Sequence, residues 1–281
     1  MQLSVRLLSF AFIVLFFQPE LQAKTPKKYR IPALSESYLE QGQASQDELN
    51  PKSIKILVWN MLKGNRKDWS KDYAKIAQAN DILLLQEGYL NSKMSKGLAQ
   101  LDGFLYHMGV SFLYVKDNNV PTGTIIGSKV DPFESGFVRT YDVEPIIKTP
   151  KTITHASYSI EGSTEKLLVL NIHGMNFSNH QTFVNHIDQA LELIEAHSGP
   201  VVFAGDFNTR TKKRMAHLRR VLNKEGMKEL GFRFDKRSKV FGNYLDHVFA
   251  RGLLTRDSVV LKDIKSSDHK PMQVEFYYPA H

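Results

Sequence analysis

The feature that most constrains the fold of this chain is a series of short apolar runs after residue 54, each followed by polar residues. Several runs are continuously apolar, which is typical of strands covered on both faces. We therefore expect a fold rich in buried strands, at residues 54–59, 82–86, 105–115, 124–129, 152–160, 167–172, 201–204, 244–249, 258–261 and 273–277.

Three segments between these runs have helical spacing, at residues 68–80, 181–197 and 212–224. In the second, Phe183, Ile187, Ala190 and Ile194 form one apolar stripe. Many strands with a few helices between them predict two packed sheets flanked by helices in one α/β domain.

The N-terminal segment differs from the rest of the chain. Residues 7–17 are apolar apart from Ser9, Arg6 precedes them, and Ala23 offers a small residue for cleavage. This layout predicts a secretory signal peptide over residues 1–23, with a retained short helix at the membrane as the alternative. We therefore expect a bacterial protein in the periplasm or outside the cell.

The next residues, 24–53, are rich in Lys, Pro, Ser and Gln and have no sustained period, which predicts an extended lead-in before a domain over residues 54–281. No stretch reaches the roughly 18 apolar residues that a membrane-spanning helix needs, so no stable anchor is expected after cleavage. The chain has no cysteine, which excludes disulfides and a cysteine-linked lipid anchor. We expect a monomer.

Polar groups follow or interrupt the predicted strands in a recurrent way. Each has an ordinary explanation, as a turn former, a helix cap or a solvated loop residue. Strands of one sheet end near each other, however, so repeated polar ends predict a common site. These residues are Asn60, Glu87, His173, Asp206, Asn208, Asp246, Asp268 and His269.

The types of these residues suit phosphoester chemistry. The carboxylates Glu87, Asp206 and Asp268 and the carboxamide of Asn60 are hard oxygen ligands, which Mg²⁺ and Mn²⁺ prefer. Phosphoester cleavage also needs a carboxylate that positions a water and cationic groups that contact the phosphate. A histidine oriented by an aspartate meets the last requirement.

These motifs together resemble one superfamily. Asn60, "LLLQE", "NIH", "GDFN", "LDH" and "SDHKP", with the internal strand "TGTIIGSK", resemble the endonuclease/exonuclease/phosphatase superfamily, also called DNase I-like, in the family's order. The residues after each motif are most similar to its YafD-like bacterial branch. The resemblance implies a four-layer αββα sandwich of two mixed sheets flanked by helices, with the site at one edge of both sheets.

The resemblance also implies roles for the metal and the water. Glu87 would be the main ligand of a Mg²⁺ ion, or of Mn²⁺, with Asn60 beside it. Asp206 would position and deprotonate the attacking water, and Asn208 would hold the phosphate or Asp206. Asp268 would complete the shell of groups that hold the metal and orient His269.

The phosphate contacts follow from the same resemblance. His173 and His269 would contact the scissile phosphate, and Asp246 would orient His269. Abasic-site endonucleases of the superfamily usually have a tyrosine at the position of His173, so abasic-site repair is not favoured.

The substrate is suggested by charge. The formal net charge is +8, and residues 210–239 hold twelve Lys or Arg against three acids. Such a run is usually a solvated face, but this one begins beside Asn208, which favours contacts with a polyanion from Arg210, Lys212, Lys213 and Arg214. Aromatic residues after 231 could stack on bases or belong to the core, and no exposed apolar hairpin for insertion into lipid is expected.

Three hypotheses follow. The first is an exported, Mg²⁺-dependent nuclease with weak sequence specificity that acts on DNA. The second is a phosphodiesterase or phosphatase acting on phospholipid headgroups or other small phosphoesters. The third is a binding module whose site has decayed, and the complete set of carboxylates and histidines argues against it.

Overall fold

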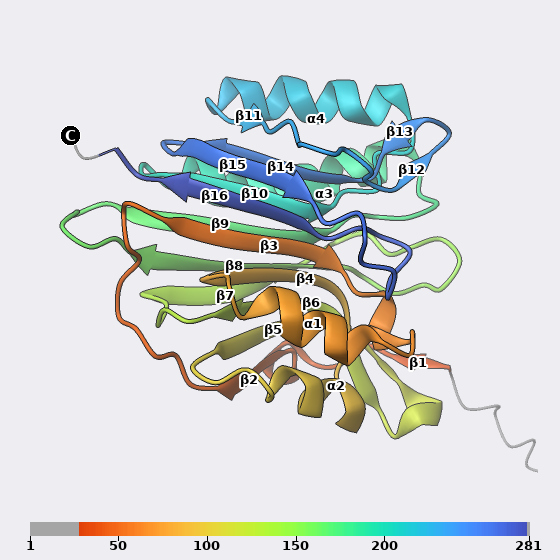
Figure 1. Ribbon diagram of the computed structural model, residues 1–281. Helices are drawn as coiled ribbons and strands as arrows, with labels where there is room; N and C mark the ends of the chain where they lie inside the picture. The colour runs from red at the N-terminus through yellow and green to blue at the C-terminus, as the bar shows by residue number, and fades with distance from the viewer. Residues whose placement is uncertain (1–27, 280–281) are drawn as a thin grey trace, which may run out of the picture.

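The computed structural model describes residues 28–279, which form two β-sheets packed face to face with helices on both outer sides (Figure 1). The strands of the first sheet are β1 (Tyr29–Arg30), β2 (Tyr38–Gly42), β3 (Ile54–Asn60), β4 (Ile82–Tyr89), β5 (Leu105–Tyr114), β6 (Val120–Ser128), β15 (Leu254–Val260) and β16 (Met272–Tyr277). Their order is β1-β5-β6-β4-β3-β16-β15, and β2 also pairs with β5.

The second sheet has the order β11-β14-β10-β9-β8-β7. Its strands are β7 (Glu134–Arg139), β8 (Thr152–Ser159), β9 (Lys166–His173), β10 (Val201–Asp206), β11 (Lys228–Glu229) and β14 (Asp246–Arg251). A separate hairpin consists of β12 (Lys239–Val240) and β13 (Asn243–Tyr244). Both large sheets mix parallel and antiparallel pairs.

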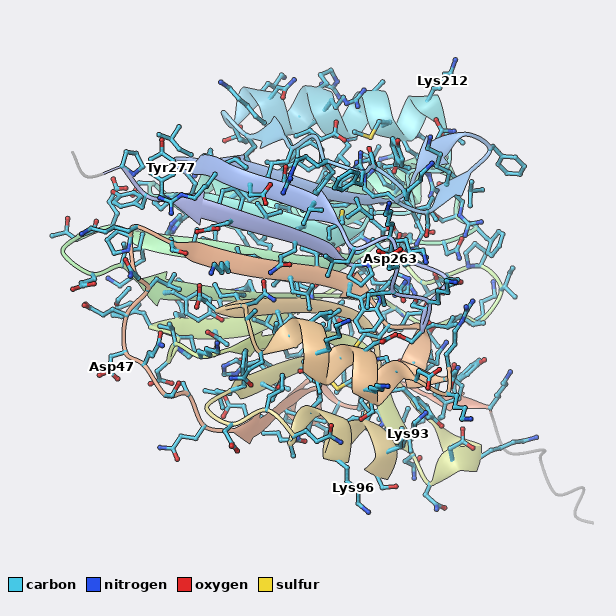
Figure 2. All side chains as sticks on the ribbon, in the orientation of Figure 1. Asp47, Lys93, Lys96, Lys212, Asp263 and Tyr277 are labelled. Atoms are coloured by element: carbon cyan, nitrogen blue, oxygen red, sulfur yellow. The ribbon has the colours of Figure 1, made fainter. Side chains whose placement is uncertain are left out.

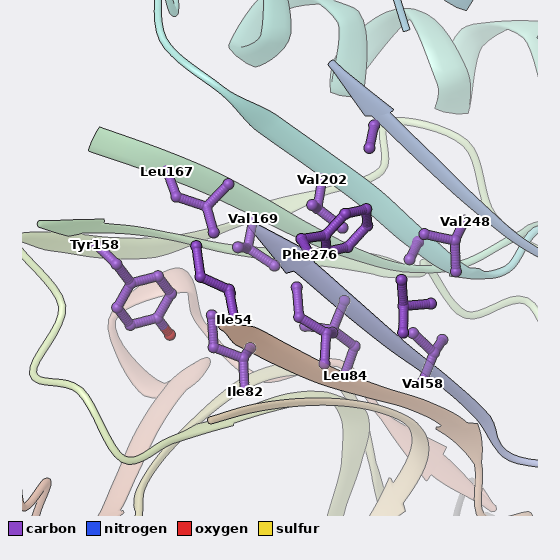
Figure 3. Packing of buried hydrophobic residues seen from close by; sticks show 14 of the residues in the cluster. Ile54, Val58, Ile82, Leu84, Tyr158, Leu167, Val169, Val202, Val248 and Phe276 are labelled. Atoms are coloured by element: carbon purple, nitrogen blue, oxygen red, sulfur yellow. The ribbon is translucent and has the colours of Figure 1, made fainter. Parts of the chain in front are cut away.

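Three apolar clusters hold the layers together. The middle cluster lies between the sheets and contains Ile54, Val58, Leu84, Val169 and Val202, shown in Figure 3. The two outer clusters pack helices on each sheet. They involve α1 (Trp69–Ala77) and α2 (Ser92–Leu98) on the first sheet, and α3 (His180–Glu195) and α4 (Lys212–Lys224) on the second.

Alternation along β3 shows why the runs are apolar throughout. Ile56 and Val58 belong to the cluster between the sheets, whereas Leu57 and Trp59 belong to the cluster under the helices. Each strand thus buries both faces, as the sequence predicts. The predicted four-layer αββα sandwich is confirmed.

The predicted strands all correspond to strands of the structure, with shifted ends, and the helix at 212–224 has the predicted bounds. The sequence analysis missed α2 and β7. It also missed β1 and β2, because residues 28–53 are more than a lead-in: β1 and β2 pair with β5, and Leu49 is buried. The predicted signal peptide lies outside the described residues. Within residues 28–279, no helix has the length and apolar character needed to cross a bilayer.

Candidate active site

Three of the predicted residues lie in one row across the second sheet. Asp206, at the end of β10, is in register with His173 at the end of the parallel strand β9 and with Asp246 at the start of the antiparallel strand β14. Gly205 makes the close approach of β10 and β9 possible: its φ is 140°, and a Cβ there would lie 2.1 Å from the carbonyl oxygen of Ile172. Strand pairing therefore places these side chains together.

The first sheet supplies Asn60 and Glu87 at the same edge, which we call the site edge. Asn60 is in register with Gln86, and Gln86 donates from Nε2 to Oδ1 of Asn171 in the opposite sheet at 2.7 Å. In a regular strand the next residue, Glu87, would face the other way. Instead the β4–β6 register shifts after Leu85, and Glu87 has a φ of 54°. This bulge turns the Glu87 carboxylate into the site.

Asn60 joins the two sheets at the site. Its Nδ2 donates to Oδ2 of Asp206 at 3.1 Å and to Oε1 of Glu87 at 3.3 Å. Asn60 is buried, and its Oδ1 accepts from the backbone N–H of Leu62. The side chain of Asn60 therefore contacts both predicted carboxylates, Glu87 and Asp206.

His269 and Asp246 form a close pair. Nδ1 of His269 lies 2.9 Å from both carboxylate oxygens of Asp246, and both side chains are buried. Burial opposes protonation of the imidazole, but Asp246, Asp206 and Asp268 raise the pKa of His269 to about 10. The predicted orientation of His269 by Asp246 is thus present, and it holds a cation in the site.

Asp206 lies at the centre of the site. Besides Asn60, its Oδ2 is approached by Nε2 of His173 at 3.7 Å and by Nε2 of His269 at 3.8 Å. Its Oδ1 accepts from the backbone N–H of Asn208 at 3.0 Å. Burial raises the pKa of Asp206 to about 6 in spite of His269. A carboxylate with this pKa is suited to accept a proton near neutral pH.

His173 has the opposite electrostatic environment from His269. Burial and the nearby Lys151 lower its pKa well below the ordinary value. At neutral pH it is therefore a neutral imidazole, which can donate one hydrogen bond.

Glu87 lies between this histidine and a lysine. Nζ of Lys63 is 3.1 Å from Oε2 of Glu87. Burial opposes ionisation of Glu87, but the positive charges of His173, when it is protonated at low pH, and of Lys63 and Lys151 lower the pKa of Glu87 to about 2. Glu87 is thus a permanent anion, as a metal ligand requires.

The donor set fits a hard divalent cation. Glu87 supplies an ionised carboxylate, the kind of oxygen ligand that suits Mg²⁺ and Mn²⁺. Asn60 lies beside it but turns Nδ2 toward Glu87, and its Oδ1 accepts from the N–H of Leu62. A second group, Asp206, Asp246 and His269, also places possible ligand atoms within 4.8 Å of one another.

The geometry does not bring Asp268 into either group. Its side chain is exposed, and its Oδ1 accepts from Ser267 Oγ at 3.3 Å. Asp268 acts on the site through its charge, which helps to raise the pKa of His269. The prediction that Asp268 is a metal ligand has no support from these contacts.

Asn208 contributes through its backbone to holding Asp206. Its side chain is buried, where Nδ2 donates to the carbonyl of Gly174 and Oδ1 accepts from Nε of Arg210 at 3.2 Å. Of the two predicted roles, holding Asp206 is the one that the structure contains.

Several cations of the basic run at residues 210–239 have structural partners within the protein. Arg214 is 5% exposed, and its guanidinium donates to backbone carbonyls of Met175, Asn208 and Ser178. The prediction that Arg214 contacts substrate is wrong, because this side chain is used to fasten the loops behind the site. Arg219, Arg233 and Arg237 pair with carboxylates.

Other members of the run remain exposed. Lys212 and Lys213 begin α4, and Figure 2 shows Lys212 at the upper corner of the molecule. Arg210 is half-buried, and its guanidinium lies 4.5 Å from the ring centre of Phe177. Of the predicted substrate-binding residues that remain accessible, Arg210 is the one that contacts a site residue, since its Nε donates to Asn208.

Sequence reasoning missed Lys63 and Lys151. Lys63 lies in a short turn after β3, and Lys151 is a buried lysine paired with Glu144 at 3.3 Å. Lys63 follows Asn60 by three residues, a spacing that could have drawn attention to it. Lys151 has no signal in the sequence, because only the fold brings it near Glu87 and His173.

Residues 57–269 match the Endonuclease/Exonuclease/phosphatase family. The chain belongs to this family. Members of the family are phosphoester hydrolases that in general depend on a divalent metal.

Relatives in sequence and solved structures are also similar to this chain. The UPF0294 protein of Klebsiella pneumoniae is 32% identical over 224 residues, which are 79% of this chain and 82% of that protein. This confirms the similarity to the YafD-like branch. The endonuclease/exonuclease/phosphatase from Beutenbergia cavernae has a TM-score of 0.62 at 16% identity, over 82% of this chain and 72% of that one.

A second solved structure is the mannosyl-6-phosphatase of Bacteroides thetaiotaomicron, with a TM-score of 0.60 at 19% identity. It covers 80% of this chain and 100% of that chain. At these identities the two structures support the fold.

Proposed function

We propose that this protein is an exported, Mg²⁺-dependent phosphodiesterase, and that its substrate is DNA, cleaved with weak sequence specificity. The observation that carries the hydrolytic part is the approach of two imidazole Nε2 atoms to one oxygen of Asp206, with Glu87 beside them. Export rests on the apolar segment 7–17.

Each group then has a task. Asp206 takes a proton from the attacking water, and the water oxygen forms a bond to phosphorus as the bond to the leaving oxygen breaks. The His269 cation stabilises the negative charge that develops on the phosphate oxygens, and neutral His173 donates a hydrogen bond to them. A divalent ion held by Glu87, with Asn60 beside it, would neutralise further charge on the phosphate.

The choice of DNA rests on the residues beside Asn208. Arg210 stacks on Phe177, and the exposed Lys212 and Lys213 follow it. Cations with an exposed aromatic ring are typical of surfaces that bind phosphates and stack bases.

A second candidate is a phosphoesterase on small phosphoesters or phospholipid headgroups. Two observations favour it. The pocket beside Glu87 and His173 has a volume of about 150 Å³, which suits a small group. The β12–β13 hairpin exposes one apolar side chain, Phe241, which is 91% accessible, where the sequence predicts no exposed apolar hairpin.

Turnover of defined substrates separates the two candidates. Purified protein is incubated with Mg²⁺ and plasmid DNA, bis(p-nitrophenyl) phosphate, p-nitrophenyl phosphate or sphingomyelin vesicles, with EDTA and Asp206→Asn controls. Metal-dependent nicking of DNA together with hydrolysis of the diester supports the nuclease. Turnover of the monoester or the lipid without nicking would overturn it in favour of the second candidate.

A further inference from the structure

A large cavity lies next to the site, and none of the residues that line it belongs to the basic run at residues 210–239. Its volume is about 670 Å³. One wall is β1 with the residues flanking it, and the other is the loop before β8, around Ile147 and Lys148.

This cavity continues into the site. Ile147 lines both it and the smaller pocket that contains Glu87 and His173. The neighbouring residues Tyr114 and Val115 line the smaller and the larger space, respectively. The two spaces therefore adjoin, and together they extend from Glu87 past the end of β5. We call the two spaces together the β1 groove.

The charge of the β1 groove is positive. Among the residues that line its larger part are Lys28, Arg30 and Lys148, and no acidic residue is among them. All three cations are exposed. Arg30 has one partner, Glu36 at 3.5 Å on the surface, and an exposed pair of this kind contributes little. The groove thus suits an anionic occupant.

Aromatic rings accompany these cations. The ring centre of Tyr29 lies 5.0 Å from that of Phe112 and 5.1 Å from that of Tyr114. Tyr29 lines the larger space, and Phe112 and Tyr114 line the smaller one. Cations interspersed with aromatic rings are typical of surfaces for single-stranded nucleic acid, where rings stack on unpaired bases.

We propose that the β1 groove binds a single nucleic-acid strand that extends from the scissile phosphate at Glu87 and His173. The proposal rests on the nuclease activity proposed above and adds a preference for unpaired strands. The cavity volume supports it, since pockets of about 300–1,000 Å³ hold ligands of small-molecule size, and single nucleotides are of that size whereas a duplex is far larger.

Binding is tested separately from catalysis, in the Asp206→Asn background, so that a failure of the proposed function does not decide the result. The groove variant carries Lys28→Gln and Lys148→Gln. The matched control carries Lys224→Gln and Lys228→Gln, two exposed lysines at the opposite end of the molecule from the site. The probe is a labelled oligothymidylate of about twelve nucleotides, within the usual range of site sizes.

The groove variant is expected to bind the probe roughly tenfold more weakly at moderate salt, and its salt slope should fall by about 1.4, or 0.7 for each lost phosphate contact. The control variant should match the parent protein. A hairpin duplex of the same sequence should bind more weakly than the single strand to the parent. With the catalytic Asp206 restored, the ratio of kcat/KM for the oligonucleotide to that for bis(p-nitrophenyl) phosphate should fall by the same factor.

Three results would overturn the proposal. One is an equal loss in both variants, which would indicate a general charge effect. Another is equal affinity for duplex and single strand in the parent protein. The third is a loss of binding to anionic phospholipid vesicles in the groove variant with no change for the oligonucleotide, which would assign the groove to lipid.

Discussion

The two histidines of the site, with their surroundings, form two halves that differ in charge although both face Oδ2 of Asp206. His173 from the second sheet and His269 from the loop before β16 both bring Nε2 within 3.8 Å of Asp206 Oδ2. Asp246 raises the pKa of His269 to about 10, whereas burial and Lys151 lower that of His173. The same residue type thus becomes a cation on one side and a neutral donor on the other, because carboxylates outweigh the effect of burial at His269, whereas burial and Lys151 act in the same direction at His173.

The largest effect is expected at the group that both halves share. Asp206→Asn removes the proton acceptor and should lower kcat by about 10³–10⁴-fold, toward the upper end of what general-base catalysis contributes. Steady-state rates on the best substrate measure it, with Asp257→Asn, at a half-exposed position paired with Arg233, as the control. A residual activity above one tenth, in a folded variant, would remove Asp206 from its assigned role.

The His269 half is tested by Asp246→Asn. In the parent protein, activity should persist to high pH and decline as His269 loses its proton near pH 10. The substitution removes the negative charge that raises this pKa, so the alkaline decline should move toward the ordinary value of about 6.5 and the rate at pH 8 should fall about 10²-fold. A pH–rate profile measures both. An unmoved alkaline limb would show that the pair does not set the charge of His269.

The environment of the His173 half also affects stability. His186 is fully buried on α3, and burial, together with Lys151, lowers its pKa to about 3. The stability associated with neutral His186 is fully present above the unfolded-state pKa of about 6.5. The free energy of unfolding then decreases as pH falls from there toward 3, because only the unfolded chain binds the proton readily.

Between pH 6.5 and 5, this single group should therefore cost about 2 kcal/mol of unfolding free energy. Urea denaturation of the parent protein and of His186→Leu at both pH values gives the difference. Equal pH slopes in the two proteins would show that His186 is not the group responsible.

The smallest effect is expected from the aromatic ring next to Arg210. Phe177→Ala should lower kcat/KM on DNA about fivefold, which corresponds to about 1 kcal/mol for a lost stacking contact. Phe133→Ala is a matched control: Phe133 is equally exposed and also lies against a cation, Lys166, at the far end of β9. Similar losses in both variants would argue against a specific contact at Phe177.

Sequence alone determined the layers and most of the site. Continuous apolar runs require strands buried on both sides, and the polar residues at their ends mark one edge. Asn60, Glu87, His173, Asp206, Asp246 and His269 all lie at that edge, as predicted.

The tertiary structure decided which charges act and where a substrate can lie. The sequence predicts Arg214 to be a surface cation, yet packing buries it beneath the site. Lys151 and the β1 groove have no local signal, because they arise from segments brought together by pairing of β1 with β5 and by the loop before β8. Burial and the sign of neighbouring charge are properties of the folded chain, and they distinguish His173 from His269.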